Sequence, residues 1–326
     1  MADGGGGAGV CTLVTADDNV TALRLIADGE CKATTGGVMN LDCSPDGSKL
    51  LACTTSAYIE LFDAKTMRSD KVFRTRALEA LFVADGQQLV ISRLKQQDLS
   101  KRSEDVIKVI KRDTEEVLTV IPGGGPKADR MRNVIAFQSD DWSKICVYDF
   151  KTGQVTHRWK GDDKRVSSVL SISPGGEVGI NSGDGKSVLL WLPPYDDQPI
   201  RFERGTTLGG FCVSPNGRFA VLGTNDRVEI WDVSARAKVS TLDMKQGEKL
   251  GITALRFLPD GKHLVSVANG GELVVWETET FREVVRQKAH SSWDCQVVVF
   301  PKDNRFATAG GDDGLIKIWK LDRPAP

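Results

Sequence analysis

Three histidines and seven cysteines are the side chains of this chain best suited to catalysis or metal binding. The histidines, His157, His263 and His290, lie far apart in the sequence, and none belongs to a recognisable nucleophile motif. The cysteines form no CxxC pair, whereas a zinc site needs several ligands within a few residues of one another. We therefore expect no metal and no cofactor, and we expect reduced thiols in the core.

Residues 183–187 read GDGKS and are similar to the end of a phosphate-binding loop. That motif requires another glycine five residues before Gly185, where this chain has Ile180, and a helix whose N-terminus faces the phosphates. An apolar run, VLLWL, follows instead. We interpret the segment as a tight turn between two strands and expect no nucleotide site.

The overall composition predicts a folded chain with little net charge and therefore no strong long-range electrostatic field. The chain has 326 residues, of which 40% are hydrophobic and 27% charged, and its formal charge is -1. It has no apolar window of about 18 residues, and its N-terminus lacks the basic and apolar regions of a secretory signal. We expect no membrane insertion and a cytoplasmic location, with the nucleus as the alternative.

A turn rich in proline, glycine and asparagine recurs along the chain. Proline sets φ at the first central position of a turn, and Gly, Asn or Asp tolerates positive φ, so each turn reverses the chain between two strands. The turns are SPDG (44–47), ADG (84–86), SPGG (173–176), SPNG (214–217), LPDG (258–261) and FPKDN (300–304). They recur about every 40 residues, and one interval is twice as long, which predicts a degenerate unit between Gly86 and Gly176.

Each unit also contains a strand-like run that ends in an aromatic residue or an aliphatic equivalent. Apolar and polar residues alternate in these runs, which is typical of half-buried strands. The runs are YIELFD (58–63), VIKVIKRD (106–113), ICVYD (145–149), VLLWL (188–192), VEIWD (228–232), ELVVWE (272–277) and LIKIWK (315–320). Only the inner strand of the degenerate unit, around residues 127–137, is poorly marked.

The Trp-Asp endings and the repeat length resemble those of WD40 repeats, over nearly the whole chain. The resemblance implies an all-β fold, a seven-bladed WD40-type β-propeller. Blades of that family carry a hydrogen-bonded set of Gly-His, Ser or Thr, Asp and Trp. Here only the last unit approaches it, with His290, Asp313 and Trp319, and we place Gly311 where the hydroxyl residue is expected.

The last unit has three strands and no fourth, while the N-terminal segment has a spare strand, VTALRLIA (20–27). We therefore predict that this strand completes the last blade and closes the ring, because closure covers exposed sheet edges. The alternative is an eight-bladed ring in which the N-terminal runs form a blade of their own. The predicted domains are a flexible Gly-rich tail (1–10) and a single propeller (11–322).

A propeller offers rigid faces for recognition, and we expect a non-catalytic scaffold or adaptor that binds other proteins or peptide segments. We expect a monomeric propeller that works within a complex. Charged and aromatic residues in loops just before inner strands are the natural contacts. These partner-binding candidates are Arg76, Lys164, Arg165, Arg204 and Trp293.

Three alternative functions remain open. The first is an RNA- or ribosome-associated propeller with a basic sector for an acidic or RNA partner, formed by Lys65, Arg68, Lys71, Arg74 and Arg76 and extended by Lys95, Lys101 and Arg102. The second is an exchange factor for the small GTPase of secretory coats, since the glycine run at 4–7 and VMNL at 38–41 are faintly similar to those propellers. The third is a hydrolase centred on the propeller channel.

Overall fold

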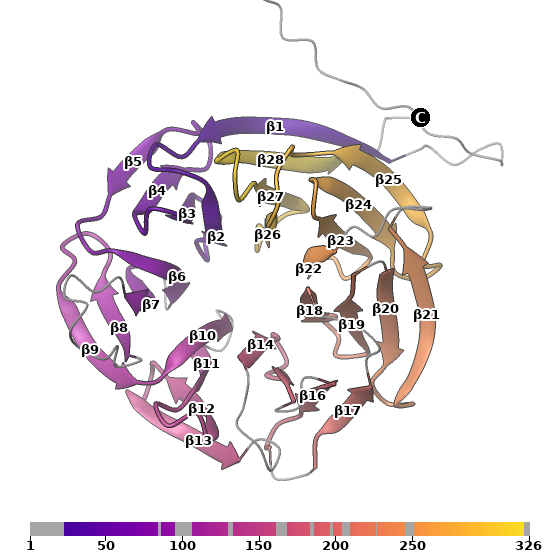
Figure 1. The fold of residues 1–326 in the computed structure, drawn as a ribbon, viewed down its shortest axis with the longest axis horizontal. Coiled ribbons are helices and arrows are strands. Elements are labelled where there is room, and N and C mark those ends of the chain that lie inside the picture. The colour runs from indigo at the N-terminus through magenta and orange to yellow at the C-terminus, as the bar shows by residue number, and fades with distance from the viewer. Residues whose placement is uncertain are drawn as a thin grey trace, which may run out of the picture.

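Seven four-stranded antiparallel sheets are arranged as radial blades around a central axis (Figure 1). The computed structural model describes residues 23–83, 86–94, 106–129, 133–160, 168–182, 186–195, 198–203, 209–225, 227–244 and 251–322. These residues form strands and turns, and they include no helix that could span a bilayer. The predicted all-β, seven-bladed propeller is confirmed, and the eight-bladed alternative is wrong.

The blades follow one another along the chain, each running from its inner to its outer strand. Blade 1 is β2 (Val38–Cys43), β3 (Lys49–Thr54), β4 (Ile59–Asp63) and β5 (Ser69–Val72); blade 2 is β6 (Ala77–Val83), β7 (Gln88–Leu94), β8 (Val106–Lys111) and β9 (Val117–Pro122). Blade 3 is β10 (Gly124–Asp129), β11 (Val134–Gln138), β12 (Lys144–Asp149) and β13 (Gln154–Lys160); blade 4 is β14 (Ser168–Ile172), β15 (Val178–Asn181), β16 (Ser187–Trp191) and β17 (Ile200–Glu203).

The remaining blades contain the last part of the chain and its first strand. Blade 5 is β18 (Gly210–Val213), β19 (Phe219–Gly223), β20 (Arg227–Asp232) and β21 (Ala237–Asp243); blade 6 is β22 (Ile252–Phe257), β23 (His263–Ala268), β24 (Glu272–Glu277) and β25 (Glu283–Lys288). Blade 7 is β26 (Gln296–Val299), β27 (Arg305–Ala309), β28 (Leu315–Asp322) and, as its outer strand, β1 (Arg24–Lys32).

The recurrent Pro and Gly turns connect the first and second strands of the blades. In blade 1 the amide of Gly47 donates to the carbonyl of Ser44 at 2.9 Å, and Gly47 has a φ of +76°. The same bond joins Gly217 to Ser214 at 2.8 Å in blade 5. Glycine is favoured at this position because other residues pay a steric cost at positive φ.

Apolar side chains fill the space between neighbouring blades. The described residues form seven buried clusters, and each cluster draws its members from two adjacent blades. The cluster between blades 7 and 1, for example, joins Phe300 and Ile318 to Val38 and Phe62. Because one buried face of every sheet packs on each neighbour, no blade completes its core alone.

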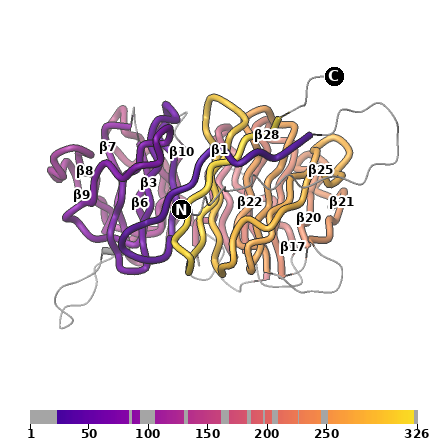
Figure 2. The backbone as a smooth tube through the Cα atoms, turned by 90° about the horizontal axis from the view of Figure 1, so that it is seen from above, coloured from indigo at the N-terminus to yellow at the C-terminus, as the bar shows by residue number. Residues whose placement is uncertain are grey.

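The ring closes where the first strand meets the last. Strand β1 pairs antiparallel with β28 over eight residue pairs, from Arg24 with Asp322 to Lys32 with Leu315, and a bulge separates Ala27 from Gly29. Figure 2 shows β1 crossing the side of the ring next to β28. The predicted closure by an N-terminal strand is confirmed.

The closing strand lies further along the chain than expected. The predicted strand covered residues 20–27, whereas β1 covers 24–32, and residues 20–22 lie outside the described part of the chain. The stretch after Ala27 is polar because β1 is an outer strand whose side chains are mostly exposed, so it carries no apolar pattern. The tail at 1–10 lies outside the described residues, and the domain limits stay predictions.

The degenerate unit is blade 3, and its inner strand β10 begins before the poorly marked stretch. Its sequence, GGPKAD, lacks the apolar run of a typical strand. The preceding Gly123 has a φ of +136°, and a Cβ there would lie 2.2 Å from the carbonyl oxygen of Gln138. The backbone at residue 123 therefore lies so close to that of Gln138 that glycine is required there. A typical strand pattern would have an apolar residue at such a position.

Deletion of the chain through Lys32 removes β1 and leaves β28 as an unpaired edge. We expect a lower melting temperature and self-association, because an exposed edge strand pairs with other chains. Thermal melts and light scattering on a sizing column measure the two effects. A deletion that stops at Ala22 keeps β1 and is the matched control. A monomeric long-deletion variant with the melting temperature of this control would contradict the closure role of β1.

Candidate functional site

Loops at the two ends of the strands form two faces of the propeller. In an antiparallel four-stranded blade, the turns that join the first to the second and the third to the fourth strand lie at one end. The loops that join the second to the third strand and one blade to the next lie at the other. Trp293 belongs to the loop between β25 and β26 and therefore to the second face, which we call the Trp293 face. It is 62% exposed.

The loop that carries Trp293 is hydrogen-bonded to the β27–β28 loop of its own blade. The amide of Trp293 donates to Asp312 Oδ2 at 3.1 Å, and the carbonyl of Trp293 accepts from the amide of Gly311 at 3.1 Å. The hydroxyl of Ser292 accepts from the amide of Asp312 at 2.7 Å. The backbone on which the exposed indole stands is thus fixed on one side.

The β23–β24 loop of blade 6 fixes the same segment on its other side. The carbonyl of Ser292 accepts from the amide of Gly270 at 2.9 Å, and the amide of Asp294 donates to Asn269 Oδ1 at 3.1 Å. A Cβ at Gly271 would lie 2.0 Å from the carbonyl oxygen of His290. The loop therefore lies directly on its neighbour's backbone, and glycine is needed for that approach.

His290, in the same loop, connects the surface to the core of blade 7. Its Nε2 is 2.8 Å from Thr308 Oγ1, and its Nδ1 is 3.1 Å from Asp313 Oδ2. The indole Nε1 of Trp319 also donates to Thr308 Oγ1, at 2.8 Å. The structure thus links the three sequence-predicted residues of the last blade through a hydroxyl that the sequence analysis did not identify.

The expectation that Gly311 occupies the hydroxyl position is wrong. Thr308 lies on β27, two residues beyond Phe306, the residue paired with Trp319, and so its side chain reaches the indole. Gly311 lies instead in the β27–β28 loop, against the carbonyl of Trp293. The strand register, which is absent from a linear sequence pattern, decides which hydroxyl faces the tryptophan.

Thr308, His290 and Asp313 have the composition of a nucleophile, base and acid triad, but their surroundings prevent that chemistry. Thr308 is 0% exposed, and its hydroxyl already accepts from Trp319, so no substrate reaches it. Burial lowers the pKa of His290, although Asp313 opposes the shift. The set is therefore a structural link between the loop and the sheet.

Blade 6 retains part of this arrangement. The indole Nε1 of Trp276 donates to Ser266 Oγ at 2.8 Å, and the buried sulfur of Met244 lies 3.0 Å from that hydroxyl, where blade 7 has histidine. In blade 5 the equivalent position, two residues beyond the partner of Trp231, is Leu222. The buried Nε1 of Trp231 has no hydrogen-bond partner in the protein. Among blades 5, 6 and 7, a hydroxyl bonded to the tryptophan of the third strand, which we call the polar set, is therefore present only in blades 6 and 7.

The other titratable candidates do not form a reactive site. His263 bonds to Asp260 in a turn, with Nδ1 2.8 Å from Oδ2, and the exposed His157 lies 3.0 Å from the hydroxyl of Thr156. The described cysteines are free thiols. Burial raises the pKa of Cys212 to about 12, so this thiol is protonated near neutral pH. The described residues contain no group of three potential metal ligands.

Arg76 lies in the loop between β5 and β6, but its guanidinium is already engaged. It stacks over the ring of Tyr58 at 4.1 Å, and its Nη2 donates to the carbonyl of Ser56 at 2.5 Å. It ties the blade 2 entrance to blade 1, which is a structural role. The other basic candidates, Lys164, Arg165 and Arg204, lie outside the described residues.

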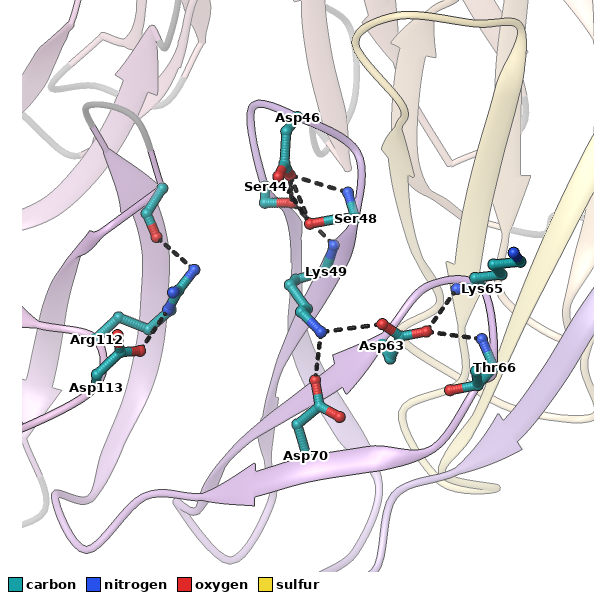
Figure 3. A network of polar contacts seen from close by, with 11 residues as sticks. Ser44, Asp46, Ser48, Lys49, Asp63, Lys65, Thr66, Asp70, Arg112 and Asp113 are labelled. Carbon is teal, nitrogen blue, oxygen red and sulfur yellow. Dashed lines mark hydrogen bonds and ion pairs between the residues drawn. The ribbon is translucent and has the colours of Figure 1, made fainter.

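Carboxylates lie among the cations of the basic sector. Figure 3 shows Lys49 between Asp63 and Asp70, with Nζ to Oδ2 distances of 3.0 and 2.6 Å, beside the Asp46 turn. Lys71 bonds to the carbonyls of Arg112 and Asp113 and lies 3.4 Å from Glu115. Lys65, Arg68 and Arg74 are exposed. Lys95, Lys101 and Arg102 lie outside the described residues, and the described charges form a mixed surface.

A groove of about 730 Å³ lies on the opposite face, between blades 5 and 6. The two Pro and Gly turns at 214–218 and 258–262 form its walls with Phe219, Phe281 and Val239. The rings of Phe219 and Phe281 meet edge to face at 5.4 Å, and Arg218 lies over Phe219 at 4.6 Å. Both rings also pack on the core between these blades, so the groove is largely a by-product of interblade packing.

Replacement of the buried hydroxyl, Thr308→Val, keeps the shape of the side chain and removes its hydrogen bonds. It leaves His290 Nε2 and Trp319 Nε1 without this partner, and we expect a loss of about 1–3 kcal/mol in the free energy of unfolding. Urea denaturation measures the change. The control is Thr241→Val, at an exposed position of β21. Equal stability of the two variants would show that the buried link contributes nothing.

Burial lowers the pKa of His290, so the unfolded chain takes up a proton at this residue before the folded chain does. The stabilising contribution of neutral His290 is therefore full above about pH 6.5, the ordinary pKa of histidine, and decreases as the pH falls below it. Urea denaturation between pH 7.5 and 5.5 should show a smaller decrease in stability for His290→Asn than for the wild type. Parallel decreases would rule out this linkage.

Comparison with known proteins places the polar set in a family context. The family described as "WD domain, G-beta repeat" matches residues 238–277 and 281–320. These two segments contain the Ser266 and Trp276 pair and the Thr308 and Trp319 pair. The sequence match therefore falls on the blades that keep a hydroxyl under the tryptophan.

Similar curated proteins align with part of this chain. Human "Pre-mRNA-processing factor 17" is 24% identical over 199 residues, 60% of this chain and 34% of that protein. "Meiotic recombination protein rec14" of Schizosaccharomyces pombe is 28% identical over 47% of this chain and 50% of its own length. "Small ribosomal subunit protein RACK1y" of Oryza sativa is 24% identical over 44% of each chain.

The aligned part of the chain spans about a third to a half of the length of these relatives. Two matched repeats, seven four-stranded blades and a ring closed by the first strand agree with one another. The chain is a seven-bladed β-propeller, and its segments 238–277 and 281–320 match the WD40-repeat family.

Proposed function

We propose that this propeller is a non-catalytic scaffold or adaptor that holds segments of other proteins on its Trp293 face. One observation carries the proposal: a tryptophan that is 62% exposed stands on a loop bonded to two neighbouring loops. Tryptophan is enriched among the residues that dominate binding energy. A backbone that is already ordered loses little further entropy when a partner binds.

We propose a non-catalytic role because the described side chains suited to catalysis are buried or already hydrogen-bonded within the fold. Within the described part of the chain, the set with the composition of a triad is buried, as the 0% exposure of Thr308 shows. A channel-centred hydrolase therefore has less support than an adaptor. The exchange-factor alternative also has little support, since Val38–Leu41 belongs to the inner strand β2, and the glycine run at 4–7 lies outside the described residues.

An RNA- or ribosome-associated role is the second candidate. The names of two relatives, a pre-mRNA-processing factor and a small ribosomal subunit protein, favour it. The exposed cations Lys65, Arg68 and Arg74 are the described residues that would serve it. Nearby Asp63, Asp70, Asp113 and Glu115 reduce the field, so this candidate ranks second. Either role suits a monomeric propeller that acts within a complex, in the cytoplasm or the nucleus.

Replacement of the exposed indole, Trp293→Ala, should abolish or strongly weaken partner binding without a loss of stability, because the side chain lies mostly in solvent. Affinity purification from native extract, followed by quantification of the recovered proteins, measures the change. The control is Trp142→Ala, which removes another exposed tryptophan (40%) from a loop of blade 3 on the same face. Recovery of the same partners with both variants would contradict the proposed contact.

Trp319→Ala distinguishes a folding role from a binding role. Trp319 is buried between blades 6 and 7, and its removal should cost about 3 kcal/mol or more of unfolding free energy. Thermal and urea denaturation of the two tryptophan variants test this contrast. A similar loss of stability in Trp293→Ala would exclude a pure binding role for Trp293.

A further inference from the structure

We propose that the Trp293 face selects partner segments that carry a cationic side chain, arginine or lysine, which lies against the Trp293 indole beside the carboxylates of Asp294 and Asp312. This inference rests on the proposed function and adds the chemistry of the ligand. The surface is defined by Trp293, Asp294 and Asp312.

Loop contacts place the two aspartates next to Trp293 along the backbone. Asp294 follows Trp293 directly, and its amide is held by Asn269. Asp312 accepts from the Trp293 amide at 3.1 Å while its own amide donates to Ser292. Both aspartates are exposed. An aromatic face and two carboxylates are therefore presented together at the start of the inner strand β26.

The surroundings of this surface are negatively charged. Besides burial, the charges of Asp313, Asp294 and Asp312 raise the pKa of the buried Cys295 thiol, whereas Lys288 lowers it. His290 does not offset them, because burial favours its neutral form and lowers its pKa, although Asp313 opposes the shift. A positively charged ligand is thus the one that this potential attracts.

The indole and the carboxylates both favour a positively charged ligand. A cation over the face of tryptophan is attracted by the ring quadrupole, and tryptophan is the most effective aromatic residue in this interaction. A guanidinium or ammonium group also donates hydrogen bonds that a carboxylate accepts. Asp294 and Asp312 have such acceptor oxygens exposed, so one cationic side chain can satisfy both kinds of contact. An acidic segment or an RNA backbone would be repelled at the same place.

Selection from a phage-displayed library of random linear peptides tests the inference on the full chain. We expect the selected peptides to carry Arg or Lys. Their binding, measured by fluorescence polarisation, should weaken about tenfold or more in Trp293→Ala. It should weaken about threefold or more in Asp294→Asn/Asp312→Asn and decrease as salt rises. Asparagine keeps the acceptor at Asp312 and tolerates the φ of +51° at Asp294.

A change in the peptide tests the same contact on an unaltered protein. Replacement of the selected Arg or Lys by Gln should reduce binding to the wild type and have little effect on binding to the double variant. Peptides that require Trp293 but carry no cation, or that bind equally after Asp→Asn replacement, would overturn the inference and leave the proposed function intact. Failure to select any peptide that depends on Trp293 would overturn both.

Discussion

The pairing of β1 with β28 is the contact on which the rest of the molecule depends. Each of the seven apolar clusters lies between two neighbouring blades, so the ring is stable only when every interface, including that between blades 7 and 1, is formed. Blade 7 is built from both ends of the described chain and supplies that last interface. The positions of the blade 7 loops therefore depend on ring closure, and so does the arrangement of the Trp293 face.

Blade 7 also joins the core to the surface through a chain of polar contacts. Trp319 donates to Thr308, Thr308 lies next to His290, and His290 belongs to the loop that carries Trp293. In most other blades the equivalent positions are aliphatic, as at Leu222 in blade 5, and apolar packing alone supports the loops. The retained polar set therefore links the core of this blade to the loop that carries the exposed Trp293.

Much of the fold could be predicted from the sequence because turns and strand runs are local patterns. The Pro and Gly turns that lie within the described residues and the seven third strands are where they were expected, and Trp293 was singled out by its position before an inner strand. Thr308 was missed because its role follows from the pairing of β27 with β28, which places it two residues beyond the partner of Trp319. The contact of Arg76 with Tyr58 was missed for a similar reason, because Tyr58 comes from the preceding blade, and a role of Arg76 in partner binding stays a prediction. Contacts between strands and between blades cannot be predicted from the local spacing of residues in the sequence.

Partner binding at Trp293, as proposed, requires an exposed indole on a backbone that is already rigid in the free protein. Measurement of 15N relaxation for the amides of residues 289–295 and for the indole of Trp293 tests this requirement. We expect backbone order parameters near those of rigid strands, about 0.85, for Trp293 and Asp294 in the free protein. Values below about 0.6 for these amides would show a flexible loop and contradict the claim.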